Sequence, residues 1–177
     1  AFDSDMCVIP RRDFPDDWPV FVGVDFGGVH MAALFTVQDP ETRRFYHFEE
    51  YLRGGLSIAQ HADEFRRIIG NRPMRWIGGA APEDQWRLEF QEAGIPIMEP
   101  PIKDVEVGIA RVYAFHKKNQ IYVFEHLTKY LDQKGSYARK LDDNNQPMEE
   151  IEHKNEFHMM DAERVLFADL WEHQGML

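Results

Sequence analysis

Three strand-like segments in succession constrain the fold of this chain more than any other feature. Segments 20–25, 30–37 and 43–52 are rich in apolar and aromatic residues, and only short loops separate them. The loop between the second and the third begins at Asp39-Pro40, a pair typical of turns. Strands joined by such short loops pair with their sequence neighbours, so the sequence predicts an antiparallel meander.

Helices and further strands alternate after this meander. A helix is expected over 57–70, because Ser57 and Gln60 fit a capping box and Gly70 suits a helix end. Further strands are expected at 74–79 and 121–124, and a brief edge strand or extended segment at 95–101. Further helices are expected at 82–94, 103–119, 125–135 and 155–173. This order predicts an α/β fold with a mixed β-sheet flanked by helices.

A β-hairpin is predicted over 136–152, in front of the last helix. The central residues of this segment, "DDNNQP", have the composition of a turn. The first 19 residues are irregular and rich in Pro and Asp, and we interpret 1–19 as a linker or tail from a longer chain. The folded domain is therefore expected over 20–177.

Composition and charge limit the possible functions. The chain has 177 residues, of which 44% are hydrophobic, so it is long enough for one globular domain with a core. The single cysteine, Cys7, excludes an intrachain disulfide framework and fits a reducing compartment. No apolar run approaches the roughly 20 residues of a membrane span. The net charge of −11 argues against binding nucleic acid through general basicity, but a nuclease remains possible because metal ions neutralise acidic sites.

Asp25 is the first candidate functional residue. It ends the apolar segment "FVGVDFGG", where burying a lone charge is costly unless something pairs with it. A metal ion or a bound ligand would be such a partner. An Asx-turn at the strand end is the alternative explanation.

Asp161 and His158 lie in the otherwise apolar stretch "FHMMDAERVLF". They are three residues apart, so they share one face of the predicted helix. A solvated helix face explains Asp161 without a function, and a structural role explains His158. Glu83 and Asp84 follow a predicted strand, and the positive end of the next helix accounts for both.

Together these acidic residues suggest a divalent metal site. Carboxylate oxygens suit Mg²⁺ or Mn²⁺. Two such ions, about 3.5–4 Å apart, activate a water and stabilise the leaving oxygen of a phosphodiester.

Five stretches of the chain carry a resemblance to a known family. They are "FVGVDFGGVHMAALF", "WIGGAAPEDQWRLEFQEAGIPI", "PPIKDVEVGIARVYAF", "IYVF" and "EFHMMDAERVLF", and they span most of residues 20–170. With these stretches the chain resembles the nuclease domain of phage terminase large subunits, which are members of the ribonuclease H-like superfamily. The resemblance implies a ribonuclease H-like sheet in which Asp25 and Asp161 are catalytic metal ligands.

The sequence departs from the family at the fourth strand. Many members carry an aspartate at its tip, where this chain has Gly78-Gly79-Ala80-Ala81. Glu83 is the nearest acid and the expected third catalytic ligand, with Asp84 in reserve. Lys103 and His158 are expected accessory residues, and Arg139 and Lys140 in the predicted hairpin are candidate DNA contacts.

The resemblance also implies an activity and partners. The expected activity is metal-dependent endonuclease cutting of concatemeric viral DNA during genome packaging, by a mechanism with two Mg²⁺ or Mn²⁺ ions. The expected partners are double-stranded DNA, an N-terminal ATPase motor domain, the portal and the small terminase subunit, in the cytoplasm of an infected bacterial host and without a membrane. No Gly-x-x-x-x-Gly-Lys phosphate loop occurs in the chain, so the motor is expected outside it.

Three alternatives compete with this interpretation. A resolvase- or transposase-like nuclease shares the fold and the acidic residues. A non-catalytic module that binds DNA or protein would explain the glycines at the fourth strand as a decayed site. A sugar kinase or actin-like ATPase also places an Asp beside glycines, but the chain is too short for its two lobes.

Overall fold

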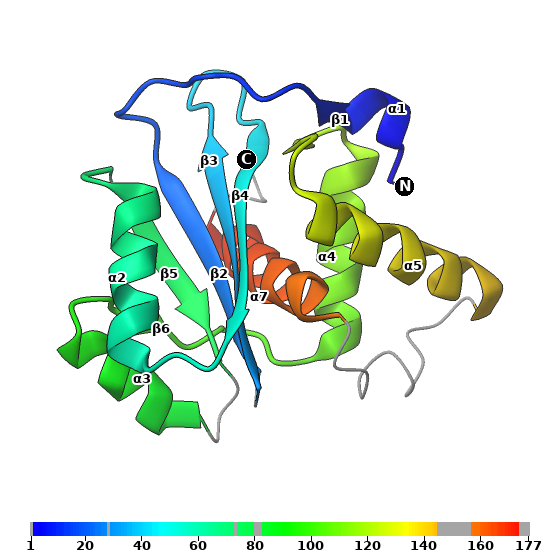
Figure 1. The fold of residues 1–177 in the computed structure, drawn as a ribbon. Coiled ribbons are helices and arrows are strands. Elements are labelled where there is room, and N and C mark those ends of the chain that lie inside the picture. The colour runs from blue at the N-terminus through cyan, green and yellow to red at the C-terminus, as the bar shows by residue number, and fades with distance from the viewer. Residues whose placement is uncertain (1, 28, 73, 80–82, 145–156, 174–177) are drawn as a thin grey trace.

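A seven-stranded mixed sheet forms the centre of the structure, a computed structural model that describes residues 2–27, 29–72, 74–79, 83–144 and 157–173 (Figure 1). The strands lie in the order β1-β7-β4-β3-β2-β5-β6. Their bounds are β1 Val8–Ile9, β2 Val20–Phe26, β3 His30–Gln38, β4 Phe45–Gly54, β5 Met74–Gly78, β6 Ile97–Met98 and β7 Ile121–Phe124. Among these strands β3 alone runs antiparallel to its neighbours.

Helices cover both faces of this sheet (Figure 1). Helices α2 and α3 lie on one face, and α4, α5 and α7 lie on the other. Their bounds are α1 Ser4–Cys7, α2 Ile58–Ile69, α3 Asp84–Glu92, α4 Val105–Lys117, α5 Thr128–Asn144 and α7 His158–His173. None of the described helices is long and apolar enough to cross a membrane.

The predicted meander and mixed sheet are confirmed. Strands β2, β3 and β4 pair in sequence order, and β5 then joins the sheet parallel to β2. The predicted cap of α2 is also present, since Ser57 and Gln60 exchange side-chain to backbone hydrogen bonds. At α4 the carboxylate of Asp104 accepts a hydrogen bond from the backbone N–H of Val107.

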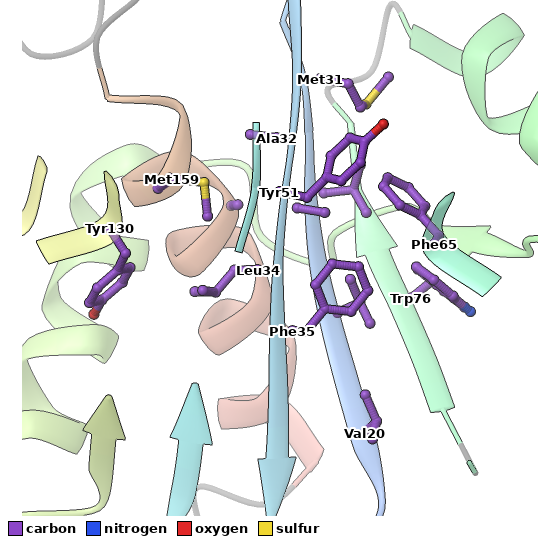
Figure 2. Close-up of a cluster of buried hydrophobic side chains, with 14 of the residues drawn as sticks. Val20, Met31, Ala32, Leu34, Phe35, Tyr51, Phe65, Trp76, Tyr130 and Met159 are labelled. Carbon is purple, nitrogen blue, oxygen red and sulfur yellow. The ribbon is translucent and has the colours of Figure 1, made fainter. Parts of the chain in front are cut away.

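Alternating side chains of the central strands build a core on each side of the sheet. Leu34 packs toward Tyr130 and Met159 on the α7 side, and Phe35 packs toward Phe65 and Trp76 on the α2 side (Figure 2). All six of these side chains are buried. The central strands are therefore covered on both faces, which explains their nearly continuous apolar sequences.

The predicted hairpin at 136–152 is wrong over its first half. Helix α5 continues to Asn144, and the rest of the predicted hairpin lies outside the described residues. The reason is the spacing of the buried residues Leu127, Tyr130, Lys134 and Tyr137, which repeats every three or four positions. This face packs against the protein, so tertiary burial outweighs the turn-like composition that follows Gly135.

Part of the predicted linker joins the sheet. Val8 and Ile9 form β1, which pairs parallel with β7. Further along, Phe14 and Trp18 are half-buried and pack against the main core. The origin of residues 1–19 as a linker from a longer chain stays a prediction.

Candidate metal centre

The close approach of α7 to β2 creates the candidate site. Gly23 and Asp25 point to the same face of β2, because side chains two residues apart share a face. At Gly23 an added Cβ would lie 2.1 Å from the carbonyl oxygen of Ala162 in α7. The glycine therefore lets the helix lie directly on the strand, and this brings the start of α7 to the carboxylate of Asp25.

His158, the first residue of α7, contacts Asp25 directly. Its Nδ1 atom lies 2.7 Å from the Oδ2 atom of Asp25. The hydrogen bond to Asp25 raises the pKa of His158 above its ordinary value, although partial burial opposes the shift. Gly27 leaves space for the imidazole, since a Cβ there would lie 2.9 Å from the Cε1 atom of His158.

Asp161 lies one turn further along α7 and responds to the charge of Asp25. Burial is the main cause that raises the pKa of Asp161 to about 6, and the Asp25 carboxylate adds to the shift. A buried carboxyl group beside a second carboxylate is costly to ionise without a counter-charge. Such a site favours a bound cation.

Arg164 partly balances this negative potential. Its guanidinium nitrogen lies 3.2 Å from the Oδ1 atom of Asp161. Helix α4 makes room for the arginine at Gly108, where a Cβ would lie 2.3 Å from the Cγ atom of Arg164. The sequence motif contains this arginine but gives it no role, because its surroundings depend on how α4 packs against α7.

The expected third ligand, Glu83, comes from a different element of the chain. Glu83 is partly buried and precedes the first residue of α3, in the connection that follows β5. Asp84 is exposed and forms an ion pair with Arg87. Among the residues that the structure describes, no group of three or more His, Cys, Asp or Glu is arranged to hold a metal ion. Asp25 contacts His158 and lies close enough to Asp161 for their charges to interact, while the roles of Glu83 and Asp84 stay predictions.

Three basic residues were predicted to contact DNA or to assist the site. Lys103 is exposed in the segment before α4 and forms an ion pair with Glu99. Arg139 and Lys140 lie in α5, in a part whose side chains are not described. Their expected contacts with DNA stay predictions.

A buried polar network on α7 was not predicted from the sequence. The carboxylate of Glu163 accepts hydrogen bonds from the phenol of Tyr130 and from Lys134 Nζ, which is 2.6 Å away, and it lies 2.8 Å from His47 Nε2. Burial alone would raise the pKa of Glu163, but Lys134 and His47 hold it well below its usual range. The network ties α7 to α5 and β4. The sequence signal for this network was Glu163, a second acidic residue in the otherwise apolar helix α7.

Solved structures similar to this chain are phage large terminases. The large terminase of a thermophilic bacteriophage matches with a TM-score of 0.74 and 17% identity, over 93% of this chain and 42% of that protein. The P22 large terminase nuclease domain matches with a TM-score of 0.71 and 18% identity, over 93% of this chain and 87% of that domain. The SPP1 large terminase nuclease domain, solved with bound Mn, matches with a TM-score of 0.59 and 21% identity, over 84% and 85%.

These matches establish the fold. The chain has the ribonuclease H-like fold of terminase nuclease domains, as predicted. It spans less than half the length of the large terminase from the thermophilic phage. Comparison with protein-family models and with curated protein sequences gives no match.

Proposed function

We propose that this chain is a metal-dependent nuclease that hydrolyses phosphodiester bonds in DNA. The observation that carries the proposal is the meeting of Asp25 at the end of β2 with His158 and Asp161 at the start of α7. The terminase nuclease fold supports it, and so does the Mn found in the SPP1 domain. The substrate would be double-stranded DNA.

The donor set fits a hard divalent cation. Asp25 and Asp161 supply carboxylate oxygens, the ligands that Mg²⁺ and Mn²⁺ prefer. Burial is the main cause of the raised pKa of Asp161 and the Asp25 carboxylate adds to it, so a cation between the two would stabilise their charged forms. We propose Asp25 and Asp161 as ligands, Glu83 as the third ligand and Asp84 as its reserve. Two bound ions would activate a water and stabilise the leaving oxygen.

His158 positions Asp25 in this proposal. With a proton on Nδ1, the imidazole donates to Oδ2 of Asp25 and leaves the other carboxylate oxygen available. Arg164 holds Oδ1 of Asp161 in the same way. The two carboxylates are thereby oriented by their own side-chain partners before any ligand binds.

The wider biological role is proposed from the likeness in fold. We propose that the chain cuts concatemeric viral DNA during genome packaging in the cytoplasm of an infected bacterium. Its partners would be an ATPase motor domain of the same protein, the portal and the small terminase subunit. Lys103, Arg139 and Lys140 would contribute contacts to the DNA backbone.

Cleavage of supercoiled plasmid tests the proposal. The purified chain is incubated with Mn²⁺, Mg²⁺ or EDTA beside Asp25→Asn, Asp161→Asn and Glu83→Gln. We expect nicking with a metal ion, its loss in EDTA, and its loss in both aspartate variants. Asp63→Asn is the matched control, because Asp63 is an exposed residue of α2 that pairs with Arg66. The result for Glu83→Gln decides the third ligand.

A non-catalytic DNA-binding module is the second candidate. It is favoured by the lack, among the described residues, of a group of three possible metal ligands. Unchanged DNA binding in Asp25→Asn, together with no cleavage by the wild type under any metal, would support this module and contradict the nuclease.

A further inference from the structure

Five aromatic rings stack in a row between the sheet and helices α2 and α3. Their order is Trp76, Phe65, Phe90, Phe26 and Trp86, and neighbouring ring centroids are 5.5–5.7 Å apart. The planes of neighbouring rings differ by at most 28°, the geometry of offset stacking. Figure 2 shows the two members at one end, Phe65 and Trp76.

The other end of this row is open. Four of the rings are buried, whereas Trp86 is only half-buried. Trp86 lines a cleft of about 450 Å³, and none of the other four rings does. One face of its indole packs on Phe26, so the row ends at the cleft with an aromatic surface that has no further ring stacked on it among the described residues.

The cleft lies beside the candidate metal centre. Its walls come from the β2–β3 and β4–α2 connections and from the helices α2 and α3, which gather at the end of β2 that carries Asp25. Gly27 belongs to both places, since it lines the cleft and a Cβ on it would press on the His158 ring. The cleft and the metal centre therefore share the same end of β2.

The walls of the cleft are partly apolar. Met31 and Leu56 are apolar, and Val29 stands exposed at the rim. No lysine or arginine occurs among the described residues that line the cleft, so a phosphate would find no counter-charge there.

Two polar side chains of the cleft, His61 and Glu89, offer hydrogen-bonding groups. His61 is buried with its Nδ1 atom 2.6 Å from the hydroxyl of Tyr51, and burial lowers its pKa. Glu89 offers an acceptor for the amino group of a base. The cleft thus combines an aromatic platform, apolar walls and hydrogen-bonding groups.

We infer that this cleft receives one unstacked nucleobase of the DNA substrate, which stacks on the open face of Trp86. The inference rests on the proposed function, because it assigns the bound DNA to the same edge of the sheet. Stacking on an aromatic side chain is tolerant of base identity, since every base has a flat π-face. The cleft therefore favours DNA that is bulged or locally unpaired near the cut.

Fluorescence of a base analogue tests the inference. The probe is a duplex oligonucleotide with one extrahelical 2-aminopurine, titrated with the full chain in EDTA so that metal-dependent cleavage is absent. We expect the wild type to quench the probe at least about twofold, Trp86→Phe to retain most of the quenching, and Trp86→Leu to lose it. Trp86→Leu should also bind the bulged duplex about tenfold more weakly, but bind a duplex with an abasic bulge as the wild type does.

A second variant tests the cleft without changing Trp86, so the inference stays testable if the Trp86 variants misfold. Val29→Glu adds a negative charge at an exposed position of the rim and should weaken binding of the bulged duplex. Met74→Glu is its matched control, because Met74 is exposed and is the first residue of β5, at the end of that strand away from the cleft. Circular dichroism verifies the fold of each variant.

The outcomes separate the cleft from the nuclease. Equal quenching by the wild type and Trp86→Leu, or no quenching by the wild type, overturns the inference. Cleavage of the same bulged duplex in Mn²⁺, compared between the wild type and Asp161→Asn, tests the proposed function alone. Quenching in EDTA without any cleavage in Mn²⁺ would keep the base cleft and reject the nuclease.

Discussion

Gly23 of β2 lies directly against Ala162 of α7, with no room for a Cβ between the strand and the helix backbone. The clash involves a backbone carbonyl, which moves only if the whole helix moves. Gly23→Ala should therefore push α7 away from β2 and cost at least about 3 kcal/mol of unfolding free energy. Urea denaturation measures this loss.

The control for Gly23→Ala is Gly70→Ala. Gly70 has a φ of +64° and nothing within 4 Å of an added Cβ, so this variant carries only backbone strain, at about 1 kcal/mol. Equal losses in the two variants would mean that the contact between β2 and α7 is not tight.

Asp161 should make the metal-free chain less stable as pH rises. Its pKa in the folded state is raised from 3.8 to about 6, so the folded chain binds this proton more tightly than the unfolded chain does. Stability is therefore lost between about pH 4 and pH 6 and remains lower above that range. In EDTA at pH 7, Asp161→Asn should be about 1–2 kcal/mol more stable than the wild type, and this gain should vanish at pH 4. Urea unfolding at both pH values checks it, with Asp63→Asn as the exposed control.

Metal binding should reverse this penalty. A cation that binds only the folded chain adds about 2.7 kcal/mol when its concentration is 100 times its Kd. Thermal unfolding with and without Mn²⁺ should show a higher Tm for the wild type, and a much smaller shift for Asp25→Asn and Asp161→Asn. A full shift in both variants would place the ion elsewhere.

The buried network around Glu163 should be essential for stability. Glu163→Gln removes the partner of Lys134, whose side chain is 8% exposed, and leaves its ammonium without a counter-charge. We expect a loss of about 3–5 kcal/mol, measured by urea unfolding. The double variant Glu163→Gln/Lys134→Met should recover part of it. If the double variant loses as much as the sum of the single changes, the two side chains are not coupled.

Local patterns predicted most of this fold. The meander follows from short loops between apolar segments, and helix α2 begins at the predicted cap, Ser57. The pattern failed at α5, where Gly135 and the polar residues after it resemble a helix end and a turn. Burial of Tyr137 against Phe157 helps to hold that helix, and this contact joins residues far apart in sequence.

The candidate site was predicted in part for a similar reason. Asp25 and Asp161 are visible as acids in apolar segments. The roles of Arg164 and Glu163 depend on partners in α4, α5 and β4, so no local spacing reveals them. The row of rings that ends at Trp86 draws on two strands and two helices and is likewise invisible in a linear pattern.

Both outer strands of the sheet, β1 and β6, are only two residues long. A short outer strand exposes few unpaired backbone N–H and C=O groups, so it offers little template for a strand from another copy. Many copies of this chain can therefore accumulate at high local concentration without their sheets fusing into aggregates.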